Sequence, residues 1–239
     1  MAVGDPPTGL PRPWYISLTA VWQDDKVNSR RISALVEGDD SPCRRAGNHI
    51  LLPVECRHFT VLAILKIIGH PPGIQSMREF SGRIFEPLRS NPGLLKSLRD
   101  SFAPFTATLS EVRCFDNATA LQFECTEELG AFRAQARTLL DSPVSTLLTR
   151  HRDSEAGRRF KKKYGVQILE SILDDPDKNY GNHTFGSVAR SPCLADASRE
   201  RWRSRLDEPI KLRFKKIHFL VSDEVLTNPR RAEEDIKIP

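Results

Sequence analysis

Apolar and polar positions alternate with a period of two in several stretches of the chain. Residues 14–22 alternate in this way and are rich in β-forming side chains, which predicts a strand. Residues 59–65 are apolar at almost every position, as in a central strand that is buried on both faces. Residues 105–110 and 120–124 flank the turn-like pair Asp116-Asn117 and predict a β-hairpin. Further strands are expected at 184–189 and 210–221.

Helical spacing of apolar residues alternates with these strands. Ser76 and Glu79 form a capping-box pattern ahead of an apolar stripe, which predicts a helix over 77–89, disturbed at Pro87. Thr126 is expected to cap a second helix, over 127–140. The other expected helical segments are 166–173, 197–205 and a short helix within the polar stretch 23–47. Strands and helices mixed in this way, with a hairpin, predict an α+β fold with a largely antiparallel sheet.

The composition is that of a folded chain, with 28% charged and 39% hydrophobic residues among 239. Residues 1–13 are rich in Pro and Gly and are expected to form a mobile lead-in. We expect a single domain over 14–228, with a basic insertion at about 145–180 and a C-terminal tail over 229–239.

Net charge and cysteine content bear on the binding partners and the compartment of the protein. The net charge of +5 favours acidic partners such as nucleic acid, although an ordinary basic surface explains it equally well. The five cysteines are scattered and contain no Cys-x-x-Cys pair, which indicates free thiols in a reducing compartment. Without a signal-peptide pattern or an apolar run long enough to span a bilayer, we expect a cytoplasmic or nuclear protein with no membrane partner. The histidine spacing and the lack of a Gly-rich phosphate loop predict no metal and no cofactor.

His58 and Thr60 form the first candidate site. Side chains two apart in a strand point to the same face, so an imidazole and a hydroxyl would lie together. An imidazole can transfer a proton near neutral pH, and a hydroxyl can hold a phosphate oxygen. A His-x-Thr triplet also occurs often by chance.

The order of motifs resembles the two-histidine (2H) phosphoesterase superfamily, which includes RNA 2′,5′-ligase-like and cyclic nucleotide phosphodiesterase proteins. The resemblance covers roughly residues 50–225, and the helix at 127–140 matches in place. The matching segments are Arg57-His58-Phe59-Thr60-Val61-Leu62, Pro104-Phe105-Thr106-Ala107-Thr108-Leu109, Ala120-Leu121-Gln122-Phe123, Ser187-Val188-Ala189-Arg190 and Ile217-His218-Phe219-Leu220-Val221-Ser222. The resemblance implies a bilobal fold in which two largely antiparallel sheets, flanked by helices, surround a central cleft.

The second motif departs from the family pattern. Aligning Ser187 on the family's second His-x-Ser/Thr puts Phe185 where the second catalytic histidine belongs. His183 lies two residues earlier on the same strand face, about 6.6 Å away if the segment is extended. A bulge at Gly186, or a different register, would bring His183 into the pocket.

The resemblance implies a metal-free phosphodiesterase acting on RNA ends, cyclic phosphates or related nucleotides. His58 and His183 would act as base and acid, while Thr60 and Ser187 would bind the phosphate between them. A positioned acid or base supplies about 10²- to 10⁴-fold in rate, so the loss of one histidine leaves a poor enzyme. The alternative is a non-catalytic nucleotide- or RNA-binding protein, and a third hypothesis is that only the fold is shared.

Several other residues have both a functional and a structural interpretation. Arg190 is expected to bind phosphate or to pair with a carboxylate. Tyr180 and Phe185 are expected to stack on a base or to pack in the core. The run from Arg158 to Lys163 is either a solvated helix face or a surface over the cleft that attracts a polyanion, and His218 fits a structural strand position better than a catalytic one.

Overall fold

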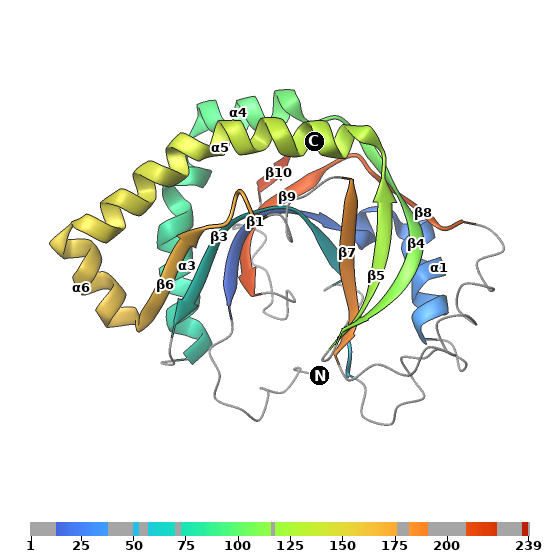
Figure 1. Ribbon diagram of the computed structural model, residues 1–239, viewed down its shortest axis with the longest axis horizontal. Helices are drawn as coiled ribbons and strands as arrows, with labels where there is room; N and C mark the ends of the chain where they lie inside the picture. The colour runs from blue at the N-terminus through green and yellow to red at the C-terminus, as the bar shows by residue number, and fades with distance from the viewer. Residues whose placement is uncertain are drawn as a thin grey trace.

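Two antiparallel five-stranded sheets form the centre of the molecule (Figure 1). The computed structural model describes residues 13–37, 50–52, 57–69, 73–115, 118–175, 182–190, 209–223 and 236–238. The first sheet, sheet A, has the order β10 (Ile236–Ile238), β9 (Ile217–Asp223), β1 (Trp14–Val21), β3 (His58–Gly69), β6 (Val166–Ser171). The second, sheet B, has the order β2 (Ile50–Leu51), β7 (His183–Arg190), β5 (Ala118–Cys125), β4 (Phe105–Phe115), β8 (Lys211–Phe214). Each sheet thus has four longer strands and one edge strand of two or three residues.

Helices cover one side of this arrangement. Figure 1 shows α5 running above both sheets, from α6 at one end of the molecule to the β4–β5 hairpin at the other. The same view shows α3 and α4 on the side of sheet A and α1 beside β4 and β8. The helical segments are η1 (Trp22–Asp24), α1 (Lys26–Glu37), α3 (Gly73–Arg89), α4 (Pro92–Ser101), α5 (Glu127–Asp153) and α6 (Glu155–Tyr164). The expected α+β fold with antiparallel sheets is therefore present.

An aromatic cluster joins the two sheets. Phe59 of β3 lies with its ring centroid 6.1 Å from Phe105, 5.8 Å from Phe123 and 5.0 Å from Phe214, and these three partners belong to sheet B. All four side chains are almost fully buried. Because apolar burial is the main favourable term in folding, this cluster ties the sheets into one core.

The segment 166–173 was expected to be helical, and this prediction is wrong. Its apolar residues fit helical spacing, but residues 166–171 form the edge strand β6. Gly165 ends α6 in the left-handed region, with φ of 64°, and the chain then pairs with β3 from Val166↔Gly69 to Ser171↔Leu65. Hydrogen bonds to a neighbouring strand, which a local pattern does not reveal, decide the conformation.

The predicted single strand over 210–221 is also wrong in detail. It is broken at Lys215 and Lys216 into β8, which pairs with β4 in sheet B, and β9, which pairs with β1 in sheet A. The connection between β8 and β9 therefore crosses from one sheet to the other.

Smaller differences concern helix ends and termini. The helix α3 begins at Gly73, so Ser76 lies within it rather than capping it. The helix α4 was not predicted, although Asn91 and Pro92 mark its start and the Asn91 side chain accepts a hydrogen bond from the Leu94 amide at 3.0 Å. The expected C-terminal tail contributes β10, and the segments 1–12 and 197–205 lie outside the described residues. Among the described helices, none is long and apolar enough to cross a membrane.

Candidate functional site

His58 and Thr60 share one face of β3, as the sequence predicted. Phe59 and Val61 are fully buried, whereas His58 and Thr60 are half-buried. Since Phe59 points into the aromatic cluster between the sheets, the imidazole and the hydroxyl must lie on the opposite face.

The strand β7 presents the residues of the second motif in the same alternating way. Thr184, Gly186 and Val188 are buried. His183 and Phe185 are exposed, and the Phe185 side chain keeps 38% of its accessible surface. Ser187 is half-buried on the same face. The three predicted residues of β7 therefore share its accessible face.

The two motif strands contact each other directly. The Thr184 hydroxyl donates to the Thr60 carbonyl at 3.4 Å. A Cβ added to Gly186 would lie 2.7 Å from the His58 carbonyl oxygen, so only glycine allows this approach. The same Cβ would lie 2.2 Å from the Trp22 ring, which packs against Phe123 of sheet B.

Arg133 of α5 holds both strands from the buried side. Its Nε donates to the Val61 carbonyl at 2.5 Å, its Nη2 to Thr60 at 3.3 Å and its Nη1 to His183 at 3.2 Å. Burial lowers the pKa of Arg133 to about 10, so the guanidinium remains charged near neutral pH. Hydrogen bonds from a charged donor are stronger than neutral ones, so Arg133 fixes the spacing of the two motifs.

These contacts show which residues of β3 and β7 lie opposite each other. Thr184 meets Thr60 and Gly186 meets His58, so β3 and β7 run in opposite directions here. Phe185 is then level with the segment between His58 and Thr60. His183 is level with Val61, which is three residues from His58, or about 10 Å along the strand.

His183 is oriented by sheet B. Its Nδ1 lies 3.4 Å from Nε2 of Gln122, a residue of β5 that is in register with Phe185. The Gln122 side chain is 8% exposed, and its Oε1 has no hydrogen-bond partner within the described part of the chain. The contact draws the imidazole of His183 toward β5.

A second polar row crosses sheet A beside Thr60. Thr19 of β1 is in register with both Thr60 and His218, and its hydroxyl lies 2.9 Å from that of Ser17. His218 is 5% exposed, and its Nε2 lies 2.9 Å from Oδ2 of Asp24. Thus His218 has a structural partner, in line with its interpretation as a strand residue.

Burial by itself would raise the pKa of Asp24. Hydrogen bonds and charge from His218 and Lys216 outweigh this effect and hold the pKa below its usual value of 3.8. Lys216 lies 3.0 Å from the other carboxylate oxygen. Asp24 therefore stays ionised and joins η1 to the start of β9.

Two predicted binding residues cannot be placed in the site. Arg190 ends β7, where its backbone pairs with Ile50, but its side chain lies outside the described residues, as does the whole of Tyr180. The basic run from Arg158 to Lys163 is part of α6, which packs at the outer end of sheet A rather than over β7 (Figure 1). Of the five cysteines, Cys125 is a free buried thiol, and burial raises its pKa to about 12.

The sequence patterns did not single out Arg133 or Gln122 as residues of the candidate site. Arg133 sits on the apolar stripe of α5 with Leu129, Ala136 and Leu140, and a cation on such a stripe is a signal for a buried, hydrogen-bonded role. Gln122 carries no comparable signal, because a polar residue in an alternating strand is expected on the solvent face.

Comparison with known proteins adds no family assignment. No family model, no curated protein and no solved structure matches the chain. Across the described ranges, no group of three or more His, Cys, Asp or Glu side chains is arranged to hold a metal ion.

Proposed function

We propose that this chain is a nucleotide- or RNA-binding protein with a bilobal 2H-like fold, in which the junction of β3 and β7 binds a phosphate group. The observation that carries the proposal is the position of Phe185 on β7. It lies opposite the segment between His58 and Thr60, where a second histidine would be needed for catalysis. In support, each motif strand belongs to a different antiparallel sheet, as in a two-lobed arrangement.

The side chains suit recognition of a nucleotide. The imidazole of His58 and the hydroxyl of Thr60 can donate hydrogen bonds to phosphate oxygens. The partly exposed ring of Phe185 can stack on a base, which is worth about 1–3 kcal/mol per base in single-strand binding. With phenylalanine at this level, a general acid for the leaving oxygen is missing, so binding without efficient turnover is expected.

A metal-independent phosphodiesterase is the second candidate. It is favoured by His183, which is exposed on the same face of β7 as Phe185 and is oriented by Gln122. His58 would then act as the base and His183 as the acid. The offset of about 10 Å along the strands between the two residues predicts slow turnover at best.

One set of measurements separates the two candidates. Thermal stabilisation by 2′,3′-cyclic nucleotides and short oligonucleotides is measured in EDTA, and the same mixtures are analysed for product by chromatography. A binding protein is stabilised without product, loses the stabilisation in His58→Ala, and gains turnover in Phe185→His. His151→Ala, at the far end of α5, is the matched control for the cyclic nucleotides, which should stabilise this variant as much as they stabilise the wild type.

Each outcome decides a claim. Product formation that is lost in both His58→Ala and His183→Ala would establish the enzyme and reject the binding-only proposal. Product formation unaffected by His183→Ala would remove His183 from the mechanism. Failure of every nucleotide and oligonucleotide to stabilise the wild type would reject both candidates.

A further inference from the structure

The positive charge of the chain is concentrated at one end of α5 and in α6. Residues 150–163 contain seven Lys or Arg and two Asp or Glu, so this segment carries a net charge of +5. The whole chain also has a net charge of +5, so the remaining residues are balanced. An uneven distribution of this kind creates a local positive potential that attracts polyanions.

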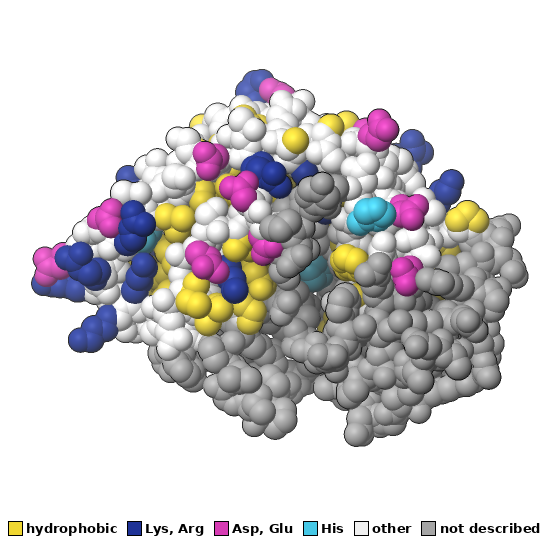
Figure 2. Space-filling view, viewed as in Figure 1, with side chains coloured by type: hydrophobic (Ala, Val, Ile, Leu, Met, Phe, Trp, Pro, Cys, Tyr) yellow, Lys and Arg dark blue, Asp and Glu magenta, His cyan; other side chains and the backbone are white. Residues whose placement is uncertain are grey.

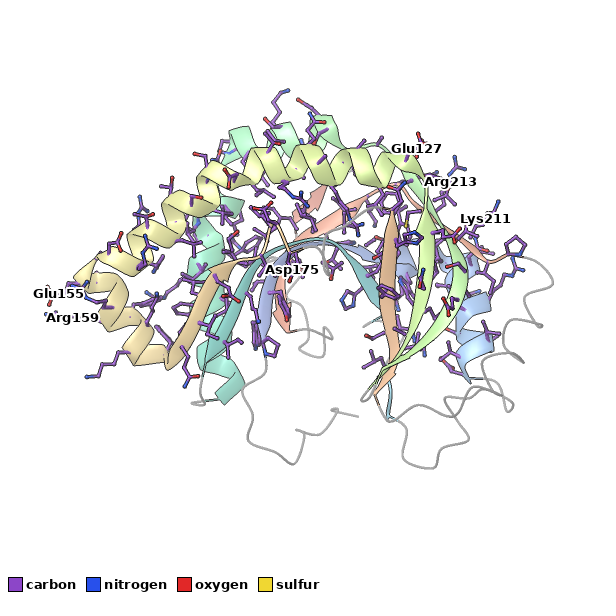
Figure 3. The ribbon with its side chains drawn as sticks, viewed as in Figure 1. Glu127, Glu155, Arg159, Asp175, Lys211 and Arg213 are labelled. Atoms are coloured by element: carbon purple, nitrogen blue, oxygen red, sulfur yellow. The ribbon has the colours of Figure 1, made fainter. Side chains whose placement is uncertain are left out.

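The cations point to solvent. Figure 2 shows Lys and Arg side chains gathered at this end of the molecule, and Figure 3 shows Arg159 extending away from it. We name the exposed members of the group the α6 basic surface: Arg150, Arg152, Arg158, Arg159, Lys162 and Lys163.

The helix that carries this surface is fixed in place. The Ser154 side chain caps its start by accepting from the Gly157 amide at 2.9 Å, and Gly165 ends it. Phe160 stacks on Phe80 of α3 at 5.3 Å, and Tyr164 packs against Phe160 at 4.6 Å. The large apolar side chains of α6 thus face the protein, which leaves no apolar anchor for a lipid bilayer on the outer side.

Few carboxylates neutralise the surface. Arg152 pairs with Asp153 at 3.0 Å and Arg159 with Glu155, but these pairs are largely exposed and weak. Across the described chain, no carboxylate lies within ion-pair distance of Lys162. The local field is also felt by His151, whose pKa is lowered by burial and by the charges of Lys161 and Arg150.

The α6 basic surface lies at the far end of β3 from the candidate site. The helix α6 leads through Gly165 into Val166, which pairs with Gly69, the last residue of β3. His58 is the first residue of the same strand, eleven residues away, or at most about 36 Å, since the register of β3 shifts at several points. Lys66 lies between them. It shares the face of Thr60, because its partner Tyr15 and the partner of Thr60, Thr19, are four residues apart on β1 and therefore lie on the same face.

We propose that the α6 basic surface docks the phosphate backbone of a single-stranded nucleic acid whose other part occupies the β3–β7 junction. The inference rests on the proposed function of that junction and adds that the ligand is an oligonucleotide, not a mononucleotide. A stacked strand advances about 3.4 Å per nucleotide, so about eleven nucleotides are enough to span the distance. The docking is independent of sequence, because the surface offers cations and no exposed aromatic ring.

The test compares ligands of two lengths. A four-site variant, Arg158→Gln, Arg159→Gln, Lys162→Gln and Lys163→Gln, keeps good helix formers while it removes four charges. Its affinity for a 14-nucleotide strand, measured by fluorescence anisotropy, should fall at least tenfold. The slope of log affinity against log salt should become less steep by about 0.7 for each phosphate that the variant no longer neutralises. Binding of a dinucleotide should not change.

A matched variant controls for net charge. Lys26→Gln, Arg30→Gln, Lys96→Gln and Arg99→Gln removes four exposed cations from α1 and α4 and should leave both affinities within about twofold of the wild type. If the four-site variant of α6 does not fold by circular dichroism, the pairs Arg158→Gln with Arg159→Gln and Lys162→Gln with Lys163→Gln are measured separately.

The outcomes distinguish this inference from the proposed function. A 14-nucleotide strand that binds the wild type and the α6 variant equally would overturn the inference and leave the junction proposal standing. Loss of dinucleotide binding in His58→Ala, together with the length effect, supports both. Binding of the wild type to vesicles with 30% phosphatidylserine, without binding of the 14-nucleotide strand, would assign the surface to membranes and overturn the inference.

Discussion

Gly186 sets the distance between the two motif strands. It brings the backbone of β7 against the His58 carbonyl and the Trp22 ring, at distances that a Cβ cannot occupy. Gly186→Ala is therefore expected to lower the free energy of unfolding by about 1–3 kcal/mol, because the added methyl overpacks the junction. Urea denaturation measures this change.

The control for this substitution lies in α3. Gly82 has no atom within 4 Å of its ideal Cβ position, so Gly82→Ala should raise stability by about 0.5–1 kcal/mol through its helix propensity. An unchanged stability of Gly186→Ala would mean that β3 and β7 are not as close as described.

Arg133 supplies a second residue-scale prediction. Arg133→Lys keeps the positive charge but can reach only part of the three carbonyls of Val61, Thr60 and His183. Each buried carbonyl left without a donor costs about 1–3 kcal/mol, so we expect a loss of at least about 2 kcal/mol in unfolding free energy. Under the proposed function, nucleotide affinity should fall as well, because the spacing of β3 and β7 changes.

The neighbouring residue Arg137 gives the comparison for Arg133. It lies one turn further along α5 and is partly exposed, so Arg137→Lys should change stability by less than about 0.5 kcal/mol. If the two Lys variants are equally stable, Arg133 has no special role in holding the junction.

The residues of the site differ in how far the sequence predicts them. His58 and Thr60 were predicted to share a face because the strand period fixes it. The relative level of Phe185 and His183 depends on how two sheets meet, which no local pattern contains. The contacts of Thr184 with Thr60 and of Gly186 with His58 supply it.

Helices and strands with strong local patterns were predicted from the sequence. Segments whose conformation depends on pairing with a distant strand were not. The continuous apolar run of β3 indicates a central strand, and the structure places it between β1 and β6. The segment that forms β6 has an ambiguous spacing, and its pairing with β3 decides its conformation. The division of 210–221 into β8 and β9 follows from a change of sheet at Lys215 and Lys216, which is a long-range property.

The connection between β8 and β9 is expected to depend on the ionised Asp24. Asp24 binds both His218 and Lys216, and its lowered pKa means that the folded state favours the ionised form. Its contribution to stability is therefore complete above the unfolded pKa of 3.8 and disappears as pH falls through the lower folded value. Asp24→Asn should cost about 2 kcal/mol at pH 7, and the difference from the wild type should shrink as the pH falls below 3.8.

Denaturation at several pH values tests this dependence. Asp141→Asn, on an exposed position of α5, serves as the control and should give a small difference from the wild type at pH 7. A difference between Asp24→Asn and the wild type that stays constant down to pH 2 would show that the Asp24 carboxylate does not contribute through its charge.

At the scale of the whole molecule, three kinds of link join sheet A to sheet B. The β8–β9 connection passes from one sheet to the other, Arg133 bonds to a strand of each, and Phe59 packs among three phenylalanines of sheet B. A core shared in this way makes independent unfolding of the sheets unfavourable, because exposing one face of the cluster exposes the other. The protein should therefore unfold in one cooperative transition, despite its two sheets.

The shared core is tested by removing its centre. Phe59→Ala should lower the free energy of unfolding by about 3–5 kcal/mol and weaken the coupling between the sheets, so that tryptophan fluorescence and far-ultraviolet circular dichroism no longer report the same urea midpoint. Phe85→Ala is the control, because Phe85 is equally buried but packs on Phe219 within the α3 side of sheet A. It should cost a similar free energy while the two midpoints stay together. Separate midpoints already in the wild type would mean that the sheets fold independently and that the β3–β7 junction forms only when both are folded.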